Sequence, residues 1–301
     1  MEITGTPLGV LKEHLSSTKE RFEKRMNGLN RRSVGIALGS GAARGLAHIG
    51  VLDVLWRAQI PIDIIVGTSI GSVIGGCYAS GMEAYDLERV ALLVNRREVL
   101  RYTDFVVPRK GGLIAGTRIE ELLRSLTGGK SFSEMRFPFA CACTDILTGD
   151  EVVMENGPVY RAMRASSSIP GVFQPVLHEG RVLVDGGILN PIPVNYLTAL
   201  NVDVTIAVDV MPTLRAQPDR EGKPPSIVTT IINAFDIMGK LVAAPLSQLA
   251  TVMLKPAVGQ VQAEEFWLAP ELIAEGRRVA EEALPKIRAA VLDTASKDRI
   301  S

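Results

Sequence analysis

A serine between two glycines, in Gly67-Thr68-Ser69-Ile70-Gly71, is the pattern in this chain best suited to chemistry. G-x-S-x-G is typical of a nucleophile elbow, in which a sharp turn from a strand into a helix exposes a serine hydroxyl. An apolar run at 62–66 predicts the buried strand, and a small-residue helical pattern follows the turn. The positive end of that helix favours negative charge developing at Ser69. The spacing predicts a serine nucleophile.

A serine nucleophile needs a base, and the chain offers few histidines for that role: His14, His48 and His178. An ordinary α/β-hydrolase places its histidine late in the chain, after the acid, and no histidine follows His178. His48 lies on an apolar helical pattern, where a packed histidine is expected, and His178 lies in a polar turn. A Ser-His-Asp triad through either residue stays open as the weaker hypothesis.

The better candidate for the base is Asp185, which ends a short predicted strand and precedes Gly186 and Gly187. Two glycines allow a second backbone segment to approach closely. A carboxylate can replace an imidazole as general base where burial raises its pKa toward neutrality. The rival carboxylates are Asp145, Asp150 and Asp209, which stay open as weaker candidates. The strand–loop setting of Asp145 suits hydrogen bonding alone.

A glycine-rich loop at 39–45 follows a predicted strand at 34–38 and precedes a predicted helix at about 46–57. Such a loop aims backbone amides at an anion, and acyl transfer needs donors of this kind for its oxyanion. The alternative is a dinucleotide-binding fingerprint. Here Arg44 occupies its sixth position, the last glycine comes one residue late at Gly45, and Asp63 begins the second strand instead of ending it.

These elements together resemble the patatin-like phospholipase family, with the closest likeness to its bacterial members and to the catalytic domain of neuropathy target esterase. The resemblance covers roughly residues 33–210. It is carried, in the family's order, by LGSGAARGLAHIGVL (38–52), VGTSIGS (66–72), ASSSIPGVFQPV (165–176) and DGGILNPIPV (185–194).

The resemblance implies a Ser–Asp dyad in which Ser69 is the nucleophile and Asp185 the base. It also implies an oxyanion hole made by the amides of Gly41 and Ala42, with Arg44 bracing the loop. Many family members carry glycine where this chain has Ala42, so a positive φ at that position would strain the alanine. The supporting positions are those of the three loops: Gly39, Ser40, Arg44, Gly45, Gly67, Gly71, Gly186 and Gly187.

Composition agrees with a single globular domain. The 301 residues are 47% hydrophobic, and 33 basic residues balance 33 acidic ones, which gives no reason to expect a nucleic-acid partner. Cys77, Cys141 and Cys143 lack metal-binding spacing and suggest free thiols in a reducing cytosol. With no secretory signal visible at the N-terminus, we expect a cytoplasmic location, and contact with the inner face of the membrane stays open.

Alternating strands and helices predict an α/β fold, a three-layer α/β/α sandwich around a mostly parallel sheet. We expect residues 1–32 to form an amphipathic helical extension that packs on the domain or a second subunit or, alternatively, lies on an anionic membrane. Residues 33–301 form the hydrolase domain, with a mobile loop at about 213–225. The apolar helix at 226–244 is a lid, a subunit interface or a core helix, and its polar residues argue against a membrane span.

The expected function is hydrolysis of lipid acyl esters through an acyl-enzyme, with a lipid or acyl ester as substrate and no metal or cofactor. Three alternatives from other classes remain: an acyltransferase that uses the same acyl-enzyme, a regulatory protein with little turnover and, last, a nucleotide-binding protein. A homo-oligomer and peripheral membrane contact are further open expectations.

Overall fold

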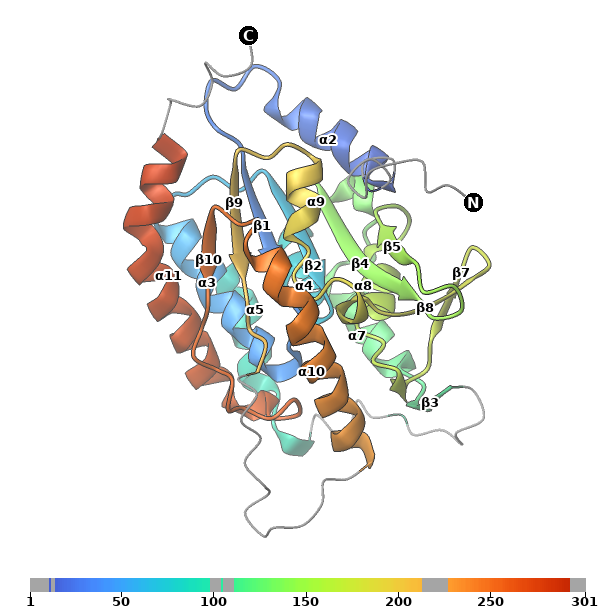
Figure 1. Ribbon diagram of the computed structural model, residues 1–301. Coiled ribbons are helices and arrows are strands. Elements are labelled where there is room, and N and C mark those ends of the chain that lie inside the picture. The colour runs from blue at the N-terminus through green and yellow to red at the C-terminus, as the bar shows by residue number, and fades with distance from the viewer. Residues whose placement is uncertain (1–10, 12–13, 98–103, 105–110, 213–226, 293–301) are drawn as a thin grey trace.

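The computed structural model describes residues 11, 14–97, 104, 111–212 and 227–292, and a β-sheet lies at its centre between two layers of helices (Figure 1). The strands of this sheet are β1 (Val34–Leu38), β2 (Ile64–Thr68), β4 (Phe139–Asp145), β5 (Glu151–Met154), β7 (Val176–His178), β8 (Arg181–Asp185), β9 (Val204–Val208) and β10 (Val252–Leu254). Their order is β10-β9-β1-β2-β4-β8-β7, and β5 also pairs with β4.

The sheet is mixed. Neighbouring strands from β10 to β4 are parallel, whereas the pairs β4–β5, β4–β8 and β7–β8 are antiparallel. Every residue of β1, β2 and β9 is buried, which explains why these strands read as continuous apolar runs in the sequence. The predicted three-layer α/β/α fold is confirmed, although β2 begins two residues later than the apolar run suggested.

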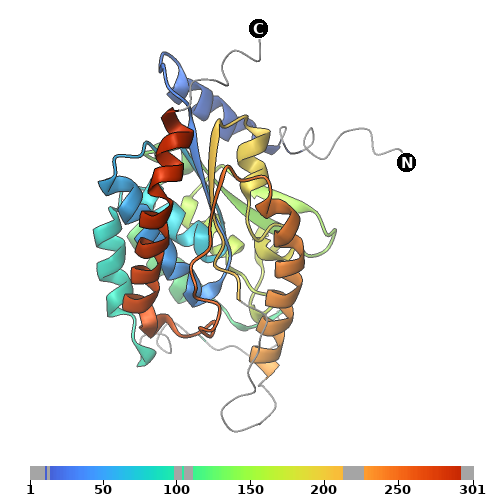
Figure 2. The ribbon, with the colours of Figure 1, turned by 60° about the vertical axis from the view of Figure 1, so that its left-hand side comes forward.

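Helices cover both faces of the sheet (Figures 1 and 2). One layer contains α3 (Ala47–Arg57), α4 (Ile70–Ala79), α5 (Ala84–Leu93), α8 (Val159–Ser166) and α11 (Ala269–Leu292), and the other contains α2 (Ser16–Met26), α9 (Val194–Ala199) and α10 (Ile227–Ser247). Side chains alternate between the two cores along each strand: Ile36 and Leu38 belong to the first and Ala37 to the second. The fold therefore has a hydrophobic core on each side of the sheet.

Smaller elements complete the described chain. A two-stranded sheet pairs β3 (Gly112–Ile114) with β6 (Gly171–Phe173), and α7 (Thr117–Leu126) lies between them in sequence. Four short 3-10 helices are η1 (Ala42–Leu46), η2 (Phe132–Glu134), η3 (Gly186–Ile188) and η4 (Phe266–Leu268).

Helix α7 begins at Thr117 without a local side-chain cap. The residue before the helix is Gly116, with φ of 77°, and no side chain of its own can cap the helix. The carboxylate of Asp104 accepts the amides of Gly116 and Thr117 instead, both at 2.8 Å. A carboxylate more than ten residues away thus satisfies the amides that a local cap would have taken.

Helix α10 runs from Ile227 to Ser247, one turn beyond the predicted end at 244. Pro245 lies in the last turn, where few helical hydrogen bonds remain for it to remove. The buried residues of α10 are Asp236, Gly239 and Ala243, so α10 is not an ordinary core helix. Among the described residues, α10 alone is long and apolar enough to cross a membrane by length and composition, which is weak evidence by itself. The predicted loop at 213–225 lies outside the described residues.

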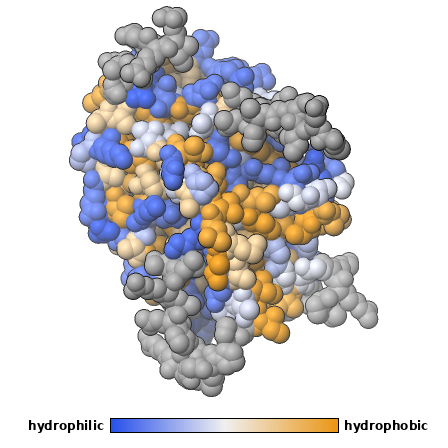
Figure 3. All heavy atoms as spheres, in the orientation of Figure 1, coloured by the Kyte–Doolittle hydropathy of each residue, from blue (hydrophilic) through white to orange (hydrophobic). Residues whose placement is uncertain are grey.

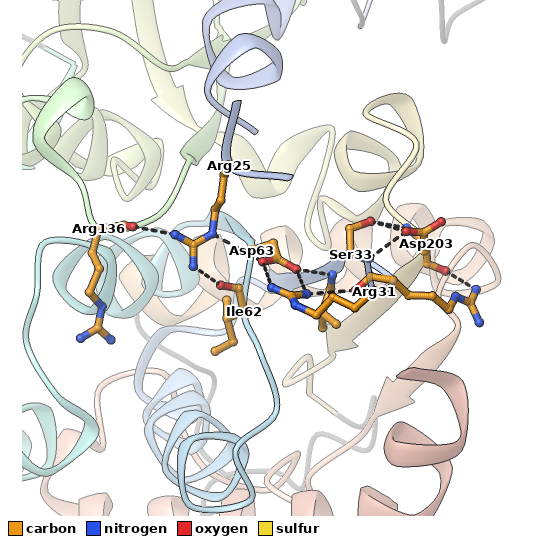
Figure 4. A network of polar contacts seen from close by, with 9 residues as sticks. Arg25, Arg31, Ser33, Ile62, Asp63, Arg136 and Asp203 are labelled. Atoms are coloured by element: carbon orange, nitrogen blue, oxygen red, sulfur yellow. Dashed lines mark hydrogen bonds and ion pairs between the residues drawn. The ribbon is translucent and has the colours of Figure 1, made fainter. Parts of the chain in front are cut away.

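The apolar side of α2 and the residues before it pack on the domain: Phe22 of the helix, with Leu11 and Leu15 ahead of it, is buried in the core that the second helical layer covers. A polar network then ties the segment after α2 to the strands (Figure 4). Its centre is the buried carboxylate of Asp63, which accepts two bonds from Arg31, at 2.7 and 2.6 Å, and the amide of Val34 at 2.9 Å. Asp63 is therefore a structural residue, as its place before β2 suggested.

Candidate active site

Ser69 forms the turn between β2 and α4, with φ of 54°. A Cβ atom at Gly67 would lie 2.6 Å from the carbonyl oxygen of Gly71, and a Cβ at Gly71 would overlap the carbonyl of Leu38. Close backbone approach therefore requires both glycines of the elbow. The predicted strand–turn–helix context of Ser69 is present.

Strand register brings Asp185 level with Ser69 across β4. Thr68 pairs with Ala142, and the next residue of β4, Cys143, pairs with Asp185. The hydroxyl of Ser69 donates to Oδ2 of Asp185 at 2.6 Å. A Cβ at Gly186 would overlap the carbonyl of Ala142, so this glycine lets the chain turn closely against β4.

The carboxylate of Asp185 is fully buried, and its second oxygen, Oδ1, accepts the amide of Gly187 at 2.8 Å. Burial raises the pKa of Asp185 from 3.8 to about 7, while the bonds from Ser69 and Gly187 oppose this rise and the negative charge of Asp236 adds to it. A carboxylate with a pKa near 7 changes its protonation state close to physiological pH, which suits a general base.

The histidines lie elsewhere. Nε2 of His48 hydrogen-bonds to the carbonyl of Gly39 at 2.8 Å, and burial lowers the pKa of His48 to about 4, so this ring is neutral at pH 7. His178 ends β7 and lies 3.9 Å from the exposed carboxylate of Glu179. Within the described residues, the hydroxyl of Ser69 bonds to Asp185 and to neither histidine.

The rival carboxylates have other partners. Asp145 accepts the amide of Leu147 at 3.1 Å, Asp150 the hydroxyl of Thr148 at 2.8 Å, and Asp209 the amide of Met211 at 3.0 Å. These contacts are local to their own loops.

The glycine-rich loop joins β1 to η1 beside the elbow, with Gly45 packed against the side chain of Ile70. Most of its amides are satisfied: Gly39 donates to Val208, Ser40 to Pro191, Ala43 to Ala263 and Arg44 to Gly41. In the part of the chain that the structure describes, the amides of Gly41 and Ala42 have no protein acceptor. Two adjacent free donors are the arrangement that an oxyanion requires.

Ala42 has φ of 50°, in the left-handed region that favours glycine. The backbone strain that we expected at Ala42 for a positive φ is therefore present, at a typical cost of about 1–2 kcal/mol. Arg44 braces the loop from within: its Nε donates to the carbonyl of Gly41 at 3.1 Å, and its terminal nitrogens reach Val261 at 3.0 Å and Asp236 at 2.7 Å.

Two residues at the site were not singled out in the sequence. The Oγ of Ser166 accepts the amide of Ser69 at 2.9 Å and donates to the carbonyl of Ala142 at 2.7 Å, which fixes the elbow against β4. The position of Ser166 in the ASSSIPGVFQPV stretch, which resembles the family, was the sequence feature that could have indicated this residue. Asp236, on α10, pairs with Arg44 across 192 residues, and no local pattern indicates that contact.

Residues 36–198 match the family described as patatin-like phospholipase, which is more than half of the chain, so the chain belongs to that family. It is 36% identical over 200 residues to an NTE family protein of Mycobacterium tuberculosis strain H37Rv, covering 66% of this chain and 55% of that protein. It is 30% identical over 236 residues to a protein named lysophospholipase nte1 of Emericella nidulans, covering 78% of this chain and 15% of that protein.

The chain spans about half the length of the first curated relatives that it matches, 55% of one and 46% of another. Among solved structures, the crystal structure of VipD from Legionella pneumophila has a similar fold, with a TM-score of 0.50 and 13% sequence identity over 87% of this chain and 67% of that one. This likeness agrees with the α/β architecture.

Proposed function

We propose that this chain hydrolyses acyl esters of lipids, with Ser69 as nucleophile and Asp185 as general base. The observation that carries the proposal is the 2.6 Å hydrogen bond from the Ser69 hydroxyl to a fully buried carboxylate. The pKa of that carboxylate, raised to about 7, and the two free amides at Gly41 and Ala42 supply the other requirements of acyl transfer.

In the proposed reaction, Oγ of Ser69 attacks the ester carbonyl carbon while Asp185 accepts the hydroxyl proton. The amides of Gly41 and Ala42 stabilise the oxyanion of the tetrahedral intermediate. Collapse of this intermediate breaks the ester bond, and the departing alkoxide takes the proton from Asp185. Water then attacks the acyl-Ser69 ester, with Asp185 again as base, and releases the fatty acid.

A lipid substrate is favoured by two observations. The chain belongs to the patatin-like phospholipase family and resembles a protein named lysophospholipase nte1. The helix beside the site, α10, also exposes large apolar side chains, and Figure 3 shows hydrophobic residues gathered along its course. We propose that this apolar face meets the surface of the lipid aggregate that holds the substrate.

The test is labelling of the full chain by a fluorophosphonate probe, together with fatty-acid release from a lysophospholipid. Ser69→Ala should abolish both, because the neighbouring hydroxyls of Thr68 and Ser72 donate to backbone carbonyls and not to Asp185. The matched control is Ser80→Ala, at the far end of the same helix, where the hydroxyl donates to the carbonyl of Cys77. Undiminished labelling in a folded Ser69→Ala protein would overturn the assignment.

A further inference from the structure

We infer that Asp236, on α10, is a positioning residue for the glycine-rich loop at 39–45, called the oxyanion loop from here on, and acts through Arg44. This inference rests on the proposed function, because it assigns a role to the loop that presents the amides of Gly41 and Ala42. Asp236 touches neither Ser69 nor Asp185 in any hydrogen bond of the described residues. Its charge adds to the raised pKa of Asp185, but its effect on the geometry of the loop passes through the arginine.

Two hydrogen bonds in series connect Asp236 to Gly41 through the side chain of Arg44. Oδ2 of Asp236 accepts from a terminal nitrogen of Arg44 at 2.7 Å, and Nε of Arg44 donates to the carbonyl of Gly41 at 3.1 Å. The peptide bond that bears this carbonyl also bears the free amide of Ala42. Holding the carbonyl oxygen in place therefore fixes the direction of the adjacent N–H group.

The loop needs such a restraint because Ala42 is held at φ of 50°, where an L-residue is disfavoured. A strained backbone persists only where its surroundings over-determine it. Without a fixed guanidinium, Ala42 can relax toward a negative φ, and its amide then turns away from the position of the oxyanion.

Stability alone does not explain a buried ion pair at this place. The side chains of Arg44 and Asp236 are 4% and 12% exposed, and a packed apolar pair is often as stable as a buried ion pair. The three hydrogen bonds of the guanidinium, to the carbonyls of Gly41 and Val261 and to the carboxylate of Asp236, instead fix where the arginine lies. This favours a positioning role over a purely stabilising one.

The placement of Asp236 on α10 is also unusual. It is the one carboxylate of the helix and it is buried, whereas exposed positions carry residues such as Ile227, Ala234, Ile237, Met238, Leu241 and Ala244. The helix thus turns its one carboxylate inward and large apolar residues outward, unlike an ordinary surface helix. The inward carboxylate is explained by its partner in the oxyanion loop.

The test is a double-mutant cycle on the full chain, with a soluble short-chain p-nitrophenyl ester as substrate. Asp236→Asn should lower kcat about ten- to a hundredfold, the usual effect of a small misplacement in an active site, with KM within about twofold. The assays are run well above pH 7, where Asp185 is ionised with or without the charge of Asp236. In an Arg44→Gln background the same substitution should then lower kcat no further, because the arginine that links Asp236 to the loop is gone.

The matched control is Asp53→Asn. Asp53 is equally buried and pairs with Arg277 at 2.6 Å and Arg57 at 2.9 Å, but it lies between α3 and α11. The Asp53→Asn substitution should lower the melting temperature and leave kcat unchanged. If Asp236→Asn does not fold, the apolar pair Arg44→Met/Asp236→Leu replaces it, and its kcat should equal that of Arg44→Met alone.

Wild-type kcat in folded Asp236→Asn, or an undiminished effect of that substitution in the Arg44→Gln background, would overturn the inference while leaving the proposed function intact. A wild-type chain without ester turnover would instead overturn the proposed function, and this inference with it.

Discussion

At the scale of single residues, the candidate site depends on a carboxylate that folding removes from water. The pKa of Asp185 rises from 3.8 to about 7, mainly because burial penalises its charge. Between these two values, the folded chain holds a proton that the unfolded chain has lost. The free energy of unfolding should therefore fall as the pH rises from about 4 to about 7.

Asp185→Asn removes the free-energy cost of burying a charged carboxylate, because the amide side chain is neutral and has nearly the same shape as the carboxylate. At pH 8 the variant should be more stable than the wild type by up to about 4 kcal/mol, since the pKa rises by about three units and each unit corresponds to about 1.4 kcal/mol. Weaker hydrogen bonds from Ser69 and Gly187 to the amide reduce this gain. Toward pH 4 the difference should shrink. Urea unfolding of both proteins across this pH range measures the effect.

The control for that experiment is Asp150→Asn, an exposed carboxylate in the turn between β4 and β5. Its substitution should give no comparable pH-dependent gain. A stability difference between Asp185→Asn and the wild type that is equal at pH 4 and pH 8 would contradict the raised pKa.

Ser69 and Asp185 were both predictable from the sequence, because each stands in a local pattern with glycines at fixed offsets. Asp236 was not, since its partner Arg44 lies 192 residues away and helix periodicity says nothing about which helix meets the loop. The sequence could not show whether φ of Ala42 is positive, because the backbone conformation there depends on Arg44 and on the packing around the loop.

At the scale of elements, α10 is the one whose role the sequence left most open. Its apolar residues were compatible with a core helix, an interface or a lid, because hydrophobicity does not reveal which side faces the domain. The structure shows that Phe235 packs toward Gly187, whereas Met238 and Leu241 are 52% and 71% exposed. The core alternative is therefore wrong for the outer side of the helix.

If the outer face of α10 meets a lipid surface, Met238→Ser with Leu241→Ser should depress turnover of long-chain lipid in vesicles more than turnover of a soluble short-chain ester. The physical reason is that these side chains bury apolar area only when the protein is on the aggregate. Parallel assays on the two substrates measure the difference between the two losses of turnover, and melting temperatures show whether the variant is folded.

The comparison variant is Phe235→Ser, on the inner side of the same helix. Because Phe235 lies beside Gly187, this change should lower both activities and the melting temperature. An equal loss on both substrates for the Met238 and Leu241 variant would show that the outer face has no role in lipid capture.

At the scale of the whole molecule, the sheet register is what assembles the site from distant segments. The parallel strands β1 and β2 bring the oxyanion loop and the elbow to one edge, and the antiparallel β8 delivers Asp185 to the same level across β4. The sequence predicted these strands well, because buried parallel strands are nearly continuous apolar runs. It did not predict their order, which depends on contacts between segments far apart in the chain.

The N-terminal segment belongs to the same assembly. The apolar side of α2 is buried against the domain, and Arg31 binds Asp63 at the edge of the sheet opposite the elbow (Figure 4). Its periodicity predicted an amphipathic helix and favoured packing on protein, but it left open whether the partner was this domain or a second subunit, since an apolar stripe suits either.

The central claim is that a carboxylate, Asp185, and not a histidine serves as the base for Ser69. The most direct test is kcat on one soluble ester for Asp185→Asn, His48→Ala and His178→Ala, each shown to be folded. We expect Asp185→Asn to lose about two to four orders of magnitude, the usual contribution of a general base, and each histidine variant to lose far less. A histidine variant as impaired as Asp185→Asn, with its fold intact, would contradict the Ser–Asp dyad.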